Sequence, residues 1–539
     1  MNERVVPAAA LAAALAAATL ASSSLAGQAP LGDEQRRGRR LYTTGAPASG
    51  APIVAVMGEG DVEVPATVLP CASCHGHDGR GNPEGGVTPA DVTWDALTKP
   101  YGTARSAGRR RPPYGRELLA RAIREGVDSG GAPLDPTMPR YRISDADLAD
   151  LVSYLEVIGT VSDPGVGEDT LTIGVVLPAA DEALAADEAG GMGAAVRAVL
   201  HAYFSEVNRR GGLYGREIEL ELVAPPATAD PDRRAAAVAE LVEAAQPFAI
   251  GTAFLAGADA EIGALAKELQ IPVVGAIGLY PDTAFPLNRY VFHLYAGMVE
   301  QGEALAAFAA ARFPAESRAA AIVHAGADRS RQVAAAMAAR LEEEGINGIL
   351  RREVADHEQQ AAAQLAAELR DAGTAAVFFA GNGAAAIGLL EAGAGMGWEP
   401  LLFMAGSSAG GDLFAAPASA DGRIFLSFPA FPTDRTEVAM LEYRSLLEAY
   451  ALPPAYQSMQ LTALASARLL VEGLARSGRD LSREKLVTAL EGVYAFETGL
   501  MPPISYGPNR RIGALGAYVV GVDLQAGSLG PTVEWVPLR

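Results

Sequence analysis

The segment Cys71-Ala72-Ser73-Cys74-His75 contains both cysteines of the chain. Two thiols on one helical turn can add across the vinyl groups of a haem, and the histidine that follows can ligate the iron. A C-x-x-C-H run is typical of c-type haem attachment. A zinc site needs about four ligands, and no further cysteine could supply them. A thioredoxin-like motif needs a βαβ setting, and a disulfide across three residues is uncommon, so we predict one covalent haem c on Cys71 and Cys74.

The iron of such a haem takes a ligand on each face, and His75 supplies the first. Met138 lies in Pro136-Thr137-Met138-Pro139, where prolines constrain a loop between two predicted helices. His77 follows His75 too closely to reach the far face, and Met57 precedes the attachment site. We therefore expect His75 and Met138 as the axial ligands. Core packing is the other role open to Met138.

Length and charge limit the organisation and the partners of the chain. Its 539 residues predict two or three domains. A net charge of −21 argues against nucleic acid as a partner. Residues 27–160 hold 15 basic and 17 acidic side chains, so nearly all of the excess negative charge lies in residues 161–539. Basic clusters at 36–40 and 109–111 could steer an acidic redox partner, although solvated loop charge is the simpler explanation.

Residues 1–26 have the pattern of a secretory signal peptide. A short charged start is followed by an Ala- and Leu-rich run and by Ser24-Leu25-Ala26, a small-x-small cleavage site. An N-terminal membrane anchor is the alternative, but the run is weakly hydrophobic for a span. No later segment is apolar over ~18 residues, so we expect no other span. Because c-type haem is fitted outside the cytoplasm, the expected location is a periplasm.

Residues 27–160 are predicted to form a small all-α domain. Helices are expected at 36–42, at 114–127 and from Ser144, whose side chain can cap the last one, with a loop over 43–70. The motif at 71–75, the loop Met138-Pro139-Arg140-Tyr141 and the helix at 144–155 resemble the class I cytochromes c. The resemblance covers roughly residues 33–159 and implies single-electron transfer. The stretch 43–70 is longer than is usual in that family.

Residues 161–170 are predicted to be a linker, and residues 171–539 a two-lobed α/β domain. Strands expected at 171–177, 217–223, 248–250 and 271–274 alternate with helices, and a second such set follows His293. Stretches such as Ile173-Gly-Val-Val-Leu-Pro178 and the run 206–220 resemble type I periplasmic binding proteins, the branched-chain amino-acid receptors of ABC importers. The resemblance covers nearly all of 171–539 and implies capture of a small solute between two lobes.

Residues that align with the ligand site of those receptors suggest a different solute. The stretch 253–257 lacks the hydroxyl that holds a ligand carboxylate, although amides at 275–279 could still donate. Ser407 stands where the receptors have an acidic partner for the ligand amine, and Arg329 replaces an aromatic contact. A buried ammonium needs a partner charge, so we expect a small carboxylate or other anion held by Arg329 rather than a free α-amino acid. Alternatively Arg329 faces solvent. The aligned site residues are Ala256, Ala276, Gly278, Arg329, Asn382 and Ser407.

No catalytic motif is recognisable, so an electron carrier with a fused solute-binding domain is the expected function. The expected partners are the solute and a redox protein such as a periplasmic dehydrogenase or another cytochrome. One alternative is an importer receptor with an ancillary haem, which would work with an ABC permease. Another is a haem-dependent oxidoreductase acting on the bound solute, which would need an open iron position.

Overall fold

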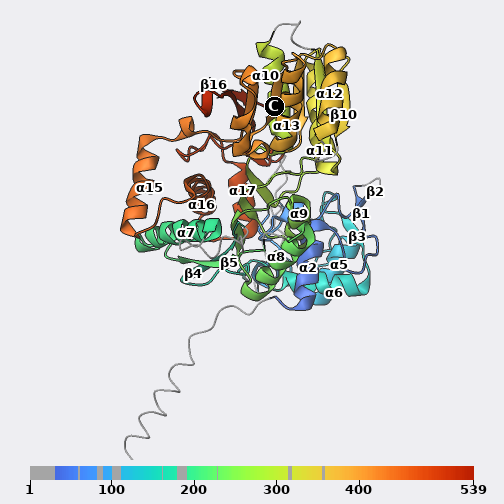
Figure 1. The fold of residues 1–539 in the computed structure, drawn as a ribbon. Coiled ribbons are helices and arrows are strands. Elements are labelled where there is room, and N and C mark those ends of the chain that lie inside the picture. Colours follow the sequence, from blue (N-terminus) through green and yellow to red (C-terminus); the bar gives the residue numbers. More distant parts are fainter. Residues whose placement is uncertain are drawn as a thin grey trace, which may run out of the picture. The chain divides into compact units, whose positions relative to one another are not determined.

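The computed structural model describes residues 31–58, 61–81, 89–99, 111–160, 162–178, 191–226, 229–313, 319–354 and 359–538. Figure 1 labels the helices and strands of the chain. The chain forms two compact units, and the boundary between them lies between Glu168 and Asp169. The predicted signal peptide lies outside the described residues. Within those residues, no helix combines the length and the apolar character that a bilayer crossing requires.

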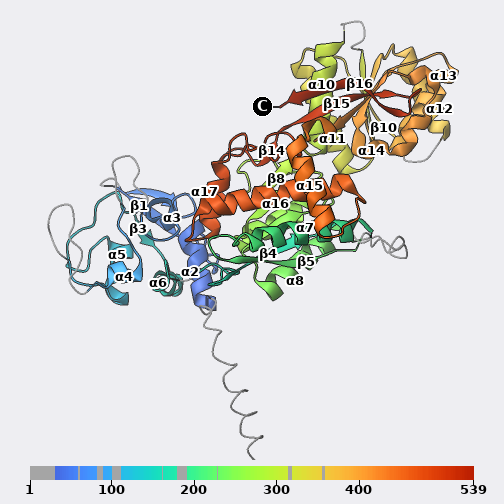
Figure 2. The same cartoon turned by 90° about the vertical axis from the view of Figure 1, so that its left-hand side faces the viewer.

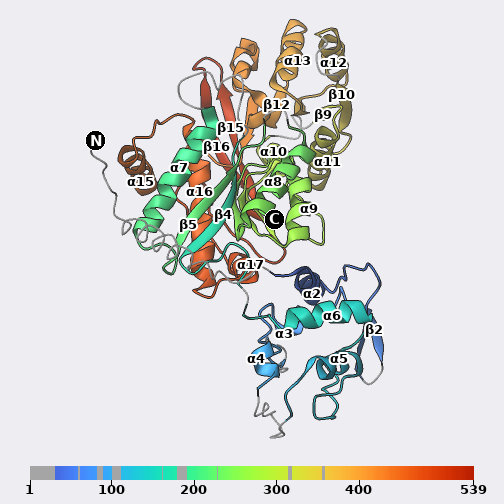
Figure 3. The same ribbon diagram turned by 90° about the horizontal axis from the view of Figure 1, so that it is seen from below.

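The first unit has a helical core, as predicted. Helices α2 and α6 cross closely (Figure 3). Glycine at position 38 of α2 permits this approach, because a Cβ atom there would lie only 2.0 Å from the carbonyl oxygen of Asp150 in α6. The predicted cap is confirmed, since Ser144 Oγ accepts from the Asp147 amide at 3.1 Å. The helices are α2 (Asp33–Thr44), α3 (Cys71–His75), α4 (Trp94–Leu97), α5 (Arg116–Glu125) and α6 (Asp145–Leu155).

The first unit also contains a three-stranded antiparallel sheet, so the predictions of a purely helical domain and of a loop over 43–70 are wrong at this point. Strand β1 (Val54–Met57) lies between β2 (Val62–Pro65) and β3 (Arg140–Arg142). Strands β1 and β2 are short but rich in valine, a residue that favours the pleated conformation. Ala55 and Val56 are buried, so β1 is part of the core of this unit, whereas β2 is largely exposed.

The first lobe of the second unit is a parallel sheet with helices on both faces. Helix α16 packs beside α7 (Figure 2) and contacts β6 and β7. Gly174 faces α8 on the other side, since a Cβ atom there would lie 3.3 Å from Leu241. In sheet order, the strands are β14 (Ile512–Ala514), β8 (Val291–Tyr295), β7 (Val273–Ala276), β6 (Ala249–Ala253), β4 (Thr170–Val176) and β5 (Glu217–Val223). The helices are α7 (Gly191–Arg209), α8 (Pro231–Ala245), α9 (Asp259–Leu269) and α16 (Gln457–Ser477).

In the second lobe, neighbouring residues along a strand face opposite sides of the sheet, and each side is covered by a layer of helices. Phe378 and Phe403 stack at 4.8 Å in the layer under α10 (Met298–Arg312) and α11 (Asp328–Glu343). Their neighbours Val377 and Leu402 face α12 (Gln359–Asp371) and α13 (Gly383–Gly395). In sheet order, the strands are β10 (Leu350–Val354), β9 (Ala320–Ala325), β11 (Ala376–Ala380), β12 (Leu401–Ala405), β13 (Ile424–Phe428), β15 (Gly516–Asp523) and β16 (Ser528–Pro537). Strand β15 is antiparallel to both of its neighbours, β13 and β16.

The chain passes between the two lobes three times: after β8, after β13 and after β14. The predicted two-lobed α/β architecture is therefore confirmed. The described helices and short 3-10 segments not yet named are α14 (Gly406–Ala409), η2 (Gly411–Ala415), η3 (Ala418–Ala420), η4 (Pro432–Asp434), α15 (Glu437–Ala449) and α17 (Arg483–Glu491).

Candidate functional sites

The short helix α3 presents the two thiols of the first unit. Cys71 and Cys74 are three residues apart, so they lie on the same side of the helix, and neither forms a disulfide. Burial raises the pKa of the Cys71 thiol to about 12. The hydroxyl of Tyr42 donates to the carbonyl of Gly76 at 2.6 Å, which ties the end of α3 to α2. The attachment motif is therefore held by the core of the unit.

The ring of His75 has the orientation and protonation state of a metal ligand. Its Nδ1 lies 2.8 Å from the carbonyl oxygen of Ala90, and a carbonyl can only accept, so Nδ1 carries the proton. The other nitrogen, Nε2, is then free of a proton and lies 3.5 Å from Met138 Sδ. Burial lowers the pKa of His75, which keeps the imidazole neutral. The structure thus brings together the two predicted axial residues, which are 63 positions apart in sequence.

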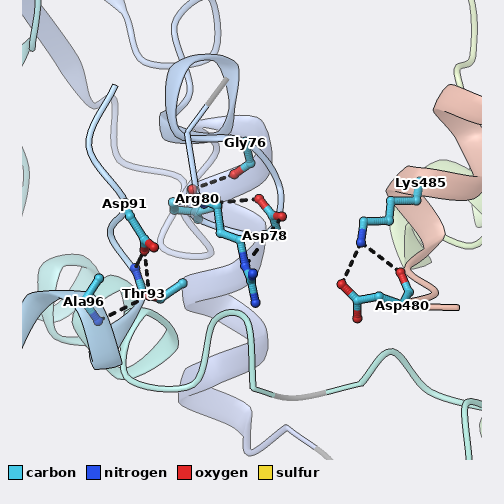
Figure 4. Close-up of polar contacts among 9 residues, drawn as sticks. Gly76, Asp78, Arg80, Asp91, Thr93, Ala96, Asp480 and Lys485 are labelled. Atoms are coloured by element: carbon cyan, nitrogen blue, oxygen red, sulfur yellow. Dashed lines mark hydrogen bonds and ion pairs between the residues drawn. The ribbon is translucent and has the colours of Figure 1, made fainter. Parts of the chain in front are cut away.

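Short-range hydrogen bonds order the segment that carries the Ala90 carbonyl. Figure 4 shows Asp91 beside Thr93, whose amide and hydroxyl donate to Asp91 Oδ1 at 2.9 and 2.6 Å. Thr93 in turn caps α4 through the amide of Ala96. The Val92 amide donates to the Gly79 carbonyl at 2.6 Å, which ties this segment to the turn after His75. These bonds fix the carbonyl that orients the His75 ring.

The loop around Met138 is held at both ends. Before it, Asp135 Oδ1 accepts from the amide and the hydroxyl of Thr137 at 3.0 and 2.8 Å, and the Met138 amide donates to the Asp135 carbonyl. After it, Arg140 begins strand β3. Met57, the weaker candidate ligand, lies at the end of β1. The donor set of two thiols, one imidazole and one thioether fits a covalent haem with two axial ligands.

The predicted solute residues of the first lobe lie in the loops after β6 and β7. Ala256 is exposed and has a φ of +49°, whereas Ala276 is buried at the end of β7. Gly278 is buried against the side chains of Asp259 and His293, since a Cβ atom there would lie 1.9 Å from Asp259 Oδ1 and 3.1 Å from His293 Nδ1. Any larger residue than glycine would therefore displace Asp259.

The predicted residues of the second lobe follow β9, β11 and β12: Arg329 is in α11, Asn382 is the N-cap of α13, and Ser407 is in α14. Asn382 caps α13 by accepting from the Ala385 amide at 2.9 Å. Ser407 is exposed, and its hydroxyl lies 3.3 Å from Met298 Sδ. Arg329 lies near the start of α11, and its guanidinium covers the ring of Tyr280, in the loop after β7, at 4.9 Å. Arg329 is thus the predicted residue that the structure brings to the loops of the opposite lobe.

Asp259, at the start of α9, is a site residue that the sequence did not single out. Its side chain is 3% exposed, and its Oδ1 accepts from the Tyr280 amide at 3.1 Å. The Tyr280 amide, in the loop after β7, therefore already has a partner. Burial raises the pKa of Asp259, and the nearby charge of Arg329 opposes that rise. The loops around Arg329 therefore contain one buried acid and one partly exposed base.

Two family models match the chain. The model described as "Cytochrome c" matches residues 67–158, and the model described as "Periplasmic binding protein" matches residues 170–528. Together with the fold, these matches define a solute-binding protein of the periplasmic type that carries a cytochrome c domain, which implies a covalently bound haem c. The second match covers more than half of the chain, so the chain belongs to the periplasmic binding protein family. No curated protein sequence matches it.

Solved structures with the same fold resemble the second unit. A branched-chain amino acid ABC transporter protein from Thermus thermophilus with bound valine is 16% identical over 69% of this chain and 98% of its own, with a TM-score of 0.53. A fatty acid ABC transporter substrate-binding protein from Thermomonospora curvata is 18% identical over 70% and 95%, with a TM-score of 0.52. A leucine binding protein from Thermotoga maritima is 18% identical over 68% and 99%, with a TM-score of 0.51. At this identity the likeness shows the fold alone.

Proposed function

We propose that this protein is a periplasmic mono-haem cytochrome c with a fused solute-binding domain, which carries single electrons and captures a small solute. Cys71 and Cys74 hold the haem covalently, and His75 and Met138 bind its iron. The observation that carries this proposal is the 3.5 Å approach of His75 Nε2 to Met138 Sδ. The mature chain begins after a signal peptide of residues 1–26. A cytochrome domain (27–160), a linker (161–170) and the solute-binding domain (171–539) follow.

When bound, the haem supplies one-electron exchange at its iron. The residues of the chain set the conditions for that exchange. The hydrogen bond to Ala90 fixes the ring of His75, and the neutral thioether of Met138 favours the reduced state of the site. The chain acts as an electron carrier rather than an enzyme. Its redox partner is a protein such as a periplasmic dehydrogenase or another cytochrome.

Replacement of Met138 tests the ligation. In Met138→Ala, the thioether–iron charge-transfer band of the oxidised protein should disappear. In the matched variant Met57→Ala, which removes the other methionine near the sheet, the band should stay. A wild-type protein without this band, with spectra of a five-coordinate iron, would contradict the proposal and favour a haem-dependent oxidoreductase that acts on the solute.

The proposed solute is a small carboxylate or another anion, and not a free α-amino acid. Arg329 reaches the ring of Tyr280 in the opposite lobe, and Asn382 and Ser407 carry no charge that could pair with an ammonium group. The buried carboxylate of Asp259 accepts from the Tyr280 amide and packs against Gly278. The guanidinium is the group that would bind the anion, because its planar donors match a carboxylate. The loops that carry Ala256, Ala276, Gly278, Asn382 and Ser407 would line the rest of the site.

Calorimetry with acetate, butyrate, benzoate, leucine and valine tests the solute class. At least one carboxylate should bind, and Arg329→Gln should weaken that binding about tenfold or more, since a hydrogen bond to a charged group contributes ~1.5–3 kcal/mol. Arg331→Gln is the matched control on the same helix, because Arg331 donates to the Gly326 carbonyl and pairs with Glu353. Tight binding of leucine or valine, or anion binding that is unchanged in Arg329→Gln, would contradict the proposal.

A second candidate function is an importer receptor whose haem is ancillary and whose partner is an ABC permease. The match to the periplasmic binding protein family favours this candidate. The two candidates differ in whether the solute affects the haem. If electron transfer and solute capture are coupled, saturating the full chain with a carboxylate that binds in calorimetry should shift the reduction potential of the haem or its electron-transfer rate. No change in either quantity would favour the importer receptor.

A further inference from the structure

The hairpin of β1 and β2 contacts the Met138 loop on both sides of the methionine. After Met138, β1 pairs with β3 in the register Val54–Arg142, Ala55–Tyr141 and Val56–Arg140. Before Met138, the Gly58 amide donates to the Pro136 carbonyl at 3.3 Å. The residues between these two anchors are few, so the loop has little freedom to move away from the hairpin.

Arg140 reinforces both anchors with its side chain. Its Nη2 donates to the Gly58 carbonyl at 3.2 Å and to Asp61 Oδ1 at 3.1 Å. The aliphatic part of the side chain packs at the end of α5, since a Cβ atom at Gly126 would lie 3.2 Å from Arg140 Cγ. Arg140 therefore connects the turn of the hairpin to the strand that leaves the methionine.

Tyr141 connects the same strand to the attachment motif. Its ring is buried, and its hydroxyl donates to the Leu69 carbonyl at 2.9 Å, two residues before Cys71. The segment that carries Met138 and the segment that carries the thiols are thus tied by one side chain. A thioether is a weak, neutral ligand, so its bond to iron depends on how firmly the chain holds it in place.

We infer that the hairpin of β1 and β2, together with β3, is a clamp that positions Met138 as an iron ligand, with Arg140 and Tyr141 as positioning residues. This inference rests on the proposed ligation by Met138. The clamp limits the fraction of time that the thioether is off the iron. It therefore slows the exchange of Met138 for external ligands in the oxidised protein.

The rate at which imidazole binds to the oxidised, haem-loaded full chain tests the clamp. Arg140→Ala should increase this rate about tenfold or more and weaken the thioether–iron band, because two hydrogen bonds to the hairpin are lost. The matched control is Arg116→Ala, in α5. The Arg116 guanidinium pairs with Glu156, just after α6, and both residues lie outside β1, β2, β3 and the loop that carries Met138. Its imidazole rate and band should equal those of the wild type.

A second variant separates loss of the clamp from simple unfolding of the Arg140→Ala protein. Tyr141→Phe keeps the buried ring and removes the hydroxyl that donates to Leu69, and it should also increase the imidazole rate. Equal rates in wild type, Arg140→Ala and Tyr141→Phe would overturn the clamp while the band confirms Met138 ligation. Absence of the band in the wild type would overturn the ligation itself, and the clamp with it.

Discussion

Replacing Tyr42 with phenylalanine tests how the haem-attachment helix is held in the first unit. The Tyr42 hydroxyl donates to the Gly76 carbonyl at 2.6 Å, and the side chain is 1% exposed. Burial also raises the pKa of Tyr42, so the hydroxyl keeps its proton. Tyr42→Phe keeps the ring beside Tyr154 and removes one buried hydrogen bond at the end of α3.

The expected cost follows from what the Gly76 carbonyl retains. A buried acceptor left without a partner costs ~1–3 kcal/mol, but the Gly79 amide still donates to Gly76 at 3.3 Å. We therefore expect a loss of about 1–2 kcal/mol in the unfolding free energy of this unit. With a slope of roughly 4 kcal/mol/M in guanidinium chloride, the unfolding midpoint falls by about 0.3–0.5 M.

The assay is guanidinium unfolding followed by the Soret absorbance of the haem, which reports on the first unit alone. Val68→Ala is the control, because Val68 is 69% exposed in the same unit and should leave the midpoint nearly unchanged. A Tyr42→Phe midpoint equal to that of the wild type would refute the argument that this bond holds α3.

Three further predictions concern a buried acid, a helix cap and the solute site. Burial raises the pKa of Glu300 from 4.5 to about 7. The protonated carboxyl therefore makes its full contribution to stability below pH 4.5, and this contribution is lost as the pH rises through about 7. In Glu300→Gln, the loss of ~3 kcal/mol of unfolding free energy between these pH values should vanish; a wild-type stability that is flat over this range would contradict the assignment. Ser144→Ala removes the cap of α6 and should lower the stability of the first unit by ~1 kcal/mol, measured by the same Soret assay, and an unchanged midpoint would show that the cap contributes nothing. Asp259→Asn removes the negative charge near Arg329 and should tighten carboxylate binding in calorimetry, whereas Asp282→Asn, at an exposed position in the loop after β7, should not; weaker binding in Asp259→Asn would argue that Asp259 helps to bind the solute.

The sequence was sufficient to predict features that depend on residues close together in the chain, such as the haem-attachment motif, the cap of α6 and strand β5. The C-x-x-C-H run identifies its own chemistry, and Ser144 precedes acidic residues as a helix cap should. Strand β5 has the predicted bounds, because an alternating strand gives a clear signal. The antiparallel pair β15 and β16 gave no clear signal and was not predicted.

Long-range pairings explain what the sequence could not predict. The strands β1 and β2 have four residues each, too few for a periodic pattern to stand out, and β3, which pairs with β1, begins only at Arg140. Asp259 is one of many acidic residues, and only folding brings it to the Tyr280 amide, 21 positions away. The environment of Arg329 likewise depends on a ring from the opposite lobe.

The intact mass of the protein, matured in a host that loads c-type haem, tests the covalent attachment of haem directly. We expect a red protein whose mass exceeds that of the mature polypeptide by one haem, and a Cys71→Ala, Cys74→Ala double variant that lacks this covalent addition. A colourless wild-type protein with the mass of the bare polypeptide would show that the first unit carries no haem and would contradict a redox function.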